Sequence, residues 1–140
     1  MSEITQRLKE ALAKQPEVKL AYLFGSHARG RAHKLSDVDV AVFLTEELSE
    51  REMGEIRIRL TAELMRALRS DAIDVVILNL ASPLLCHRVL RDGKLIYSVD
   101  ETTRVRFTTD TYRLYLDHRY LYDILDEAMF RRIREGRFGH

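Results

Sequence analysis

The spacing of apolar residues changes along the first part of the chain from a helical period to continuous runs. Apolar residues three and four positions apart predict a helix with Ser2 as its N-cap, and they are Ile4, Leu8, Ala11 and Leu12. Pro16 ends this helix, because proline cannot continue it. Residues 18–24 and 38–44 are almost continuously apolar. Runs of this length predict two strands.

The second part of the chain alternates in the same way. Ser49 and Glu52 form a capping-box pattern. The amphipathic helix that follows has an apolar stripe formed by Met53, Ile56, Leu60, Leu64 and Leu68. The remaining predicted elements are a strand at 72–78, a short helix begun by Ser82 and Pro83, a turn at 92–93, a short edge strand at 95–98 and a long helix from 101 to about 134.

Helices and strands therefore alternate along the sequence, with a further short helix expected between the first two strands. This order predicts an α/β sandwich built on one small mixed β-sheet. At 140 residues the chain has the length of one domain and can bury a proper core. We expect a single domain over residues 1–140, with its core at about 18–98 and a C-terminal helix at about 101–135.

The composition is that of an ordinary globular protein, with 46% hydrophobic and 32% charged residues. A net charge of +1 gives no general attraction to nucleic acids or membranes. The single cysteine, Cys86, excludes an intrachain disulfide and is expected to pack as a small apolar residue. No apolar run approaches the ~20 residues of a membrane span, and no signal peptide is visible. We expect a cytoplasmic protein.

Residues 25–39, between the first two strands, carry the most informative chemistry. Asp37 and Asp39 are two positions apart, so on an extended strand both carboxylates point to the same face. Two anions about 5 Å apart repel by roughly 3 kcal/mol at an effective dielectric constant near 20. A divalent cation held by oxygen ligands offsets that cost. Gly25 and Ser26 form a turn whose backbone N–H groups can receive phosphate.

A third carboxylate lies in the strand predicted at 72–78. Asp74 is flanked by apolar residues, and an ionised Asp is costly there unless it is paired or metal-bound. If this strand lies beside the one that carries Asp37 and Asp39, the three carboxylates converge. The alternative for Asp74 is an edge-strand position facing solvent. Asp71 is a competitor, and we interpret it as a turn residue.

The segment 25–39 resembles the minimal nucleotidyltransferases of the DNA polymerase beta-like superfamily. Their pattern Gly-Ser-x-Ala-Arg-Gly, five residues, Ser-Asp-x-Asp is matched at every fixed position. The resemblance implies Mg²⁺-dependent nucleotidyl transfer, with three residues as catalytic metal ligands, Asp37, Asp39 and Asp74. It assigns four residues to the nucleotide, Gly25, Ser26, Arg29 and Ser36. For Arg29 a surface salt bridge is the alternative, and Ser36 most simply caps the turn before the second strand.

Free-standing chains of this kind are similar to the MNT antitoxins encoded beside HEPN toxins. That resemblance implies transfer of AMP from ATP to a tyrosine hydroxyl of a HEPN ribonuclease toxin, which silences the toxin. It also implies a hetero-oligomer with the toxin and no direct contact with nucleic acid or membrane. Two alternatives stay open. One is transfer to a small molecule, as in aminoglycoside nucleotidyltransferases, and the other is neutralisation by binding alone.

The long C-terminal helix carries a second motif. Arg113, His118 and Tyr120 match the Arg-x4-His-x-Tyr signature of HEPN ribonucleases. We interpret the match as coincidence, because a single helix cannot supply the helical bundle of a HEPN domain. This helix is instead expected to pack on the core or on a partner through Tyr112, Tyr115, Leu116, Tyr122, Ile124 and Leu125.

Overall fold

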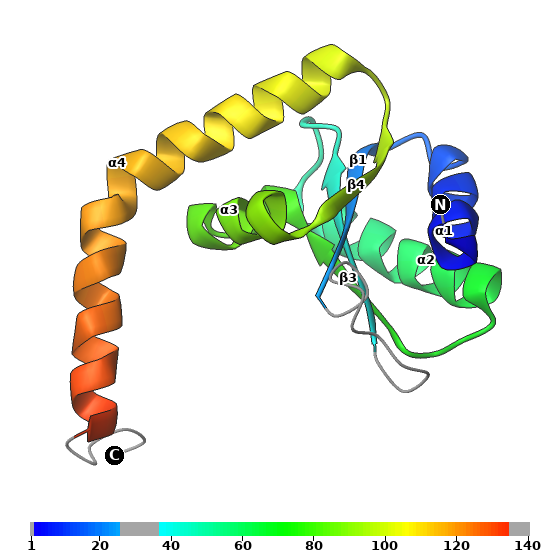
Figure 1. The fold of residues 1–140 in the computed structure, drawn as a ribbon. Helices are drawn as coiled ribbons and strands as arrows, with labels where there is room; N and C mark the ends of the chain where they lie inside the picture. Colours follow the sequence, from blue (N-terminus) through cyan, green and yellow to red (C-terminus); the bar gives the residue numbers. More distant parts are fainter. Residues whose placement is uncertain (1, 26–36, 135–140) are drawn as a thin grey trace.

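The computed structural model describes residues 2–25 and 37–134. Within these ranges the chain forms one mixed four-stranded sheet with helices on both faces (Figure 1). The elements in chain order are α1 (Glu3–Ala13), β1 (Val18–Phe24), β2 (Val38–Leu44), α2 (Glu50–Leu68), β3 (Ile73–Ile77), the 3-10 helix η1 (Leu78–Leu80), α3 (Pro83–Asp92), β4 (Lys94–Ser98) and α4 (Glu101–Arg134). The predicted α/β fold with a small mixed sheet and a long C-terminal helix is confirmed. The short helix expected between β1 and β2 lies outside the described residues.

The strand order in the sheet is β3-β2-β1-β4. β1 pairs antiparallel with both β2 and β4, whereas β2 pairs parallel with β3. The parallel pair needs a crossover connection, and α2 supplies it. β3 and β4 are therefore the two edges of this sheet, as predicted for the strand at 95–98.

The two faces of the sheet pack against different helices (Figure 1). On one face the strands bury apolar side chains, among them Val40 and Val75, against α1 and against α2, which contributes Leu60. The core on the other face is smaller, lies under α3 and the start of α4, and includes Tyr22 and Phe107. Side chains alternate between these two faces along each strand. Any residue of β2 or β3 can thus be assigned to a face from its neighbours.

The predicted helix starts are confirmed, and each is stabilised by a side-chain cap. The hydroxyl oxygen of Ser2 accepts a hydrogen bond from the Thr5 N–H. Ser49 and Glu52 form the reciprocal capping box at the start of α2. The Ser82 side chain accepts from the Leu85 N–H, with a proline at the start of α3. Caps of this kind contribute about 1 kcal/mol each.

β3 is shorter than predicted because an asparagine side chain replaces the backbone ladder. The predicted strand at 72–78 ends at Ile77, and residues 78–80 turn into η1. Asn79 Oδ1 accepts from the Leu44 N–H at 2.8 Å, and its Nδ2 donates to the Leu44 carbonyl at 2.9 Å. The side-chain amide therefore satisfies the last backbone groups of β2 while the main chain leaves the sheet.

α4 packs on the body of the protein only through its first half. Phe107 and Thr111 are buried there, and Tyr115 stacks on His87 at a centroid distance of 3.7 Å. In the second half, Leu121 and Leu125 are 50% and 55% exposed, and Figure 1 shows this half of α4 extending away from the sheet. This helix was predicted to pack on the core or on a partner. The described apolar side chains Leu121 and Leu125 of its distal half are exposed and do not pack on the core. No described helix is both long and apolar enough to cross a membrane.

Gly54, in the middle of α2, provides a stability test of the fold. A Cβ added at this position meets no atom within 4 Å, and alanine costs less backbone entropy than glycine in a helix. We expect Gly54→Ala to raise the free energy of unfolding by about 0.5–1 kcal/mol. Urea denaturation followed by circular dichroism measures this. A decrease in stability would contradict the open environment of Gly54.

Candidate active site

Two carboxylates, those of Asp39 and Asp74, lie side by side on the face of the sheet that packs against α3 and α4, and Asp37 lies next to them in the chain. Asp37 directly precedes β2, and the N–H of Val38 donates to the Ala72 carbonyl at 2.8 Å. Asp39 and Asp74 are direct partners in the parallel register of β2 and β3. Partners in register point to the same face of a sheet. The predicted placement of the third strand beside the one carrying Asp39 is confirmed.

Gly25 closes this end of the site from the side of β1. It has a left-handed backbone with φ = 78°, which glycine adopts without steric cost. A Cβ built on Gly25 would lie 2.3 Å from Asp39 Oδ2. The close approach of backbone and carboxylate thus requires glycine. It places the end of β1 directly against the acidic strand β2.

Asp74 lies on an edge strand, and its side chain is 55% exposed. Its Oδ1 is 3.8 Å from Nη2 of Arg57, which lies on α2. Asp74 thus occupies the edge-strand position considered as the alternative, and it also lies beside Asp39 as predicted. Arg57 is not among the site residues predicted from the sequence. The only signal in the sequence is an arginine directly after Ile56, a residue of the apolar stripe that faces the sheet.

The competitor Asp71 is exposed and lies before β3, outside the strand. This agrees with its interpretation as a turn residue. The remaining predicted nucleotide-binding residues, Ser26, Arg29 and Ser36, lie outside the described residues. Their roles stay predictions.

The donor set at this end of the sheet consists of carboxylate oxygens, the ligands that Mg²⁺ prefers. Asp37 and Asp39 are two positions apart in the chain, and Asp74 is on the strand next to β2. Within residues 2–25 and 37–134, however, no three His, Cys, Asp or Glu side chains are gathered into a metal-binding cluster. The chemistry of the donor set fits a divalent cation, and the assignment of the three aspartates as ligands stays a prediction.

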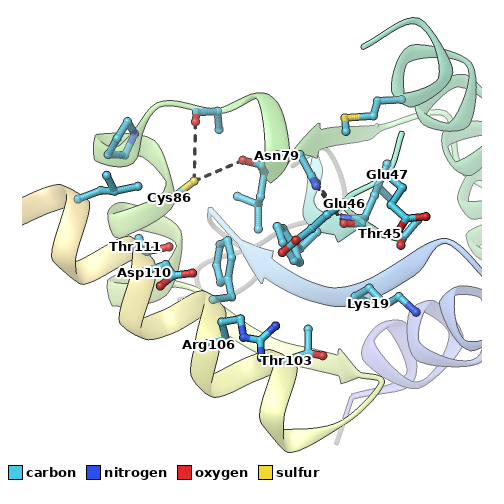
Figure 2. A pocket seen from close by; sticks show the side chains of 18 residues that line it. Lys19, Thr45, Glu46, Glu47, Asn79, Cys86, Thr103, Arg106, Asp110 and Thr111 are labelled. Carbon is cyan, nitrogen blue, oxygen red and sulfur yellow. Dashed lines mark hydrogen bonds between the residues drawn. The ribbon is translucent and has the colours of Figure 1, made fainter. Parts of the chain in front are cut away.

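A pocket of about 650 Å³ lies at the opposite end of the sheet (Figure 2). It is lined by Lys19 at the start of β1, by Thr45 after β2 and by Arg106 and Asp110 of α4. Because a strand rises ~3.3 Å per residue, Thr45 lies roughly 20 Å beyond Asp39. This pocket is therefore separate from Asp39 and Asp74.

Cys86 lies in the wall of the same pocket and is buried. Its thiol donates to the Leu78 carbonyl, with a sulfur–oxygen distance of 3.5 Å. Burial raises the pKa of the Cys86 thiol and disfavours the reactive thiolate. The prediction that Cys86 packs as a small apolar residue is confirmed.

The Arg113, His118 and Tyr120 match lies on the exposed side of α4. Arg113 is 3.7 Å from the carboxylate of Asp110, and His118 Nδ1 is 2.8 Å from the Leu114 carbonyl. Tyr120 is 79% exposed. Each of these contacts is within one turn of the same helix. The interpretation of the match as coincidence stays a prediction.

Comparisons with known proteins show the family to which this chain belongs. The family described as "Polymerase beta, Nucleotidyltransferase" matches residues 6–102. The chain is 35% identical over 100 residues to the protein adenylyltransferase MntA of Shewanella oneidensis, which covers 71% of this chain and 68% of that protein. The MntA of Aphanizomenon flos-aquae is also 35% identical, over 103 residues, covering 69% of this chain and 68% of that protein.

The fold is similarly close to solved structures. A chain of a toxin–antitoxin complex with AMP-PNP superposes with a TM-score of 0.72 at 31% identity, covering 89% of this chain and 98% of that one. A complex of the tri-AMPylated HEPN toxin of Shewanella oneidensis with its MNT antitoxin gives a TM-score of 0.66 at 28% identity, covering 90% of this chain and 96% of the matched one. The chain belongs to the polymerase beta nucleotidyltransferase family and, within it, to the MntA-type protein adenylyltransferases.

Proposed function

We propose that this protein is an antitoxin that transfers AMP from ATP to a tyrosine hydroxyl of a cognate HEPN ribonuclease toxin and so neutralises it. The observation that carries the proposal is the 35% identity with a protein adenylyltransferase over two thirds of its length. The similarity to an MNT antitoxin in complex with an AMPylated HEPN toxin supports the choice of partner. We infer a hetero-oligomer with the toxin, formed in the cytoplasm by the single domain of residues 1–140.

The reaction balances as a displacement at the α-phosphorus of ATP. A bond forms between the tyrosine oxygen and the α-phosphorus, the bond between the α- and β-phosphates breaks, and pyrophosphate leaves. The tyrosine proton passes to a base. Asp74 suits this role because its half-exposed carboxylate is accessible to a protein substrate.

Asp37 and Asp39 would hold Mg²⁺ together with Asp74. The bound ion supplies positive charge that offsets the charge of the triphosphate. Gly25 lets the main chain approach Asp39 without a clash, so that the end of β1 can lie beside the departing phosphates. In this proposal Ser26, Arg29 and Ser36 complete the nucleotide site.

Intact mass spectrometry tests the proposal. We expect incubation of the purified chain with ATP, Mg²⁺ and the product of the neighbouring gene to add one or more AMP masses to that product. A parallel incubation without Mg²⁺, in the presence of EDTA, is expected to leave its mass unchanged. Binding of the partner without a mass gain would instead indicate neutralisation by occlusion. Modification of an added aminoglycoside alone would indicate a small-molecule acceptor.

A further inference from the structure

Arg57 links helix α2 to the free edge of the sheet. Within the part of the chain that the structure describes, β3 has a neighbouring strand only on the side of β2. The Ala72 carbonyl accepts from Val38 in β2, and carbonyls of successive residues in a strand alternate in direction. The carbonyl of Val75, three residues on, is therefore directed away from β2. It accepts a hydrogen bond of 2.8 Å from Nε of Arg57.

The same guanidinium reaches the carboxylate of Asp74. Its Nη2 is 3.8 Å from Asp74 Oδ1, which is an ion-pair distance but too long for a hydrogen bond. Asp74 is thus attracted toward Arg57, but the two side chains form no short bidentate contact. Such a contact would compete with a proton or a cation for the carboxylate oxygens. Both side chains are 55% exposed, so the attraction is modest and is screened by solvent.

The hydrogen bond to Val75 makes this weak ion pair directional. An exposed arginine on a helix ordinarily samples many rotamers, and its average effect on one carboxylate is small. Here the main chain of β3 holds the guanidinium in place beside the side chain of the preceding residue. A fixed cation on the outer side of Asp74 restricts the directions that this edge carboxylate adopts.

We propose that Arg57 is a positioning residue, which orients the Asp74 carboxylate for the acceptor hydroxyl. This role rests on the proposed function, in which Asp74 receives the proton of the toxin tyrosine. Arg57 acts through Asp74 and has no contact with the nucleotide in this proposal. Its loss should therefore lower the rate of transfer without weakening the binding of ATP.

The test compares Arg57→Gln, Arg57→Lys and the control Arg59→Gln. Arg59 lies on the same helix but pairs with Glu17, away from β3. We expect Arg57→Gln to lower kcat for AMP transfer to the toxin about tenfold, as for other residues that orient a catalytic group. The KM for ATP should change less than twofold. Arg57→Lys should restore part of kcat, and Arg59→Gln should leave it unchanged.

A double-mutant cycle shows whether the effect passes through Asp74. Arg57→Gln should lower kcat much less in an Asp74→Glu background than in the wild-type chain, because the displaced carboxylate no longer depends on Arg57. An undiminished loss in that background would overturn the proposal. So would an unchanged kcat accompanied by a lower Tm, which identifies a purely structural edge contact. No AMP on the toxin with the wild-type chain contradicts the proposed function itself, whereas a wild-type rate in Arg57→Gln contradicts only the role of Arg57.

Discussion

Replacement of Asp37 by asparagine is expected to abolish AMP transfer while leaving the fold intact. The amide has the shape of the carboxylate but lacks its charge, and the proposed magnesium site would lose one of its anionic ligands. We expect a loss in turnover on the order of 10³-fold, or about 4 kcal/mol of transition-state stabilisation. Asp37 is exposed and precedes β2, so its removal costs no packing. Turnover is measured as AMP added to the toxin per unit time, and folding by Tm.

Asp71 provides the matched control for this experiment. It is also an exposed aspartate before a strand, but it lies outside β3 and is interpreted as a turn residue. We expect Asp71→Asn to retain wild-type turnover. If Asp37→Asn turned over ATP and toxin at the wild-type rate, Asp37 would have no role as a metal ligand. Inactivity of Asp71→Asn in a folded chain would make Asp71 the third acidic residue in place of Asp74.

The fold was predictable because local signals and tertiary packing agree along most of the chain. Ser49 and Glu52 mark the start of α2 through a reciprocal hydrogen-bonding pattern that depends only on local sequence. The end of β3 was not predictable in this way. It depends on Asn79 bonding to Leu44, which is 35 residues away in sequence. Such a contact leaves no periodic signal.

The site was predictable to the extent that it depends on strand alternation. Two aspartates at strand spacing share a face where both lie in the strand. Asp37 directly precedes β2, so its predicted place beside Asp39 stays a prediction. The relation of Asp39 to Asp74 needed the parallel register, in which the two residues turn out to be direct partners. Arg57 was missed because its role depends on how α2 crosses the edge of β3. Helical periodicity only indicates that this residue lies beside the apolar stripe.

α4 shows a different limit of sequence reasoning. Its apolar and aromatic residues predicted packing on the core or on a partner, and periodicity could not separate these two modes. In the structure, Phe107 and Thr111 are buried in the first half, whereas Leu121 and Leu125 are exposed in the second. The difference arises because the helix is longer than the sheet face it covers. The distal half extends beyond that face (Figure 1).

Substitution of Gly25 by alanine is expected to inactivate the enzyme through Asp39. The new Cβ would lie 2.3 Å from Asp39 Oδ2, whereas ordinary contacts begin near 3.4 Å. The carboxylate or the turn must therefore move by about 1 Å, and a displacement of this size costs on the order of 10²-fold in rate. The left-handed backbone at Gly25 adds a strain of about 1–2 kcal/mol for any residue with a Cβ.

The two consequences of Gly25→Ala are measured separately, and Gly54→Ala is the control. Backbone strain lowers the free energy of unfolding, whereas displacement of Asp39 lowers kcat in the chain that remains folded. Gly54→Ala adds the same methyl group to a site with open space, so it should retain wild-type kcat and gain stability. A Gly25→Ala variant that is less stable but has full kcat would show that Asp39 tolerates displacement, which contradicts its proposed place at the reacting phosphates. Loss of kcat in the folded variant ties the glycine at the end of β1 to the acidic strand beside it.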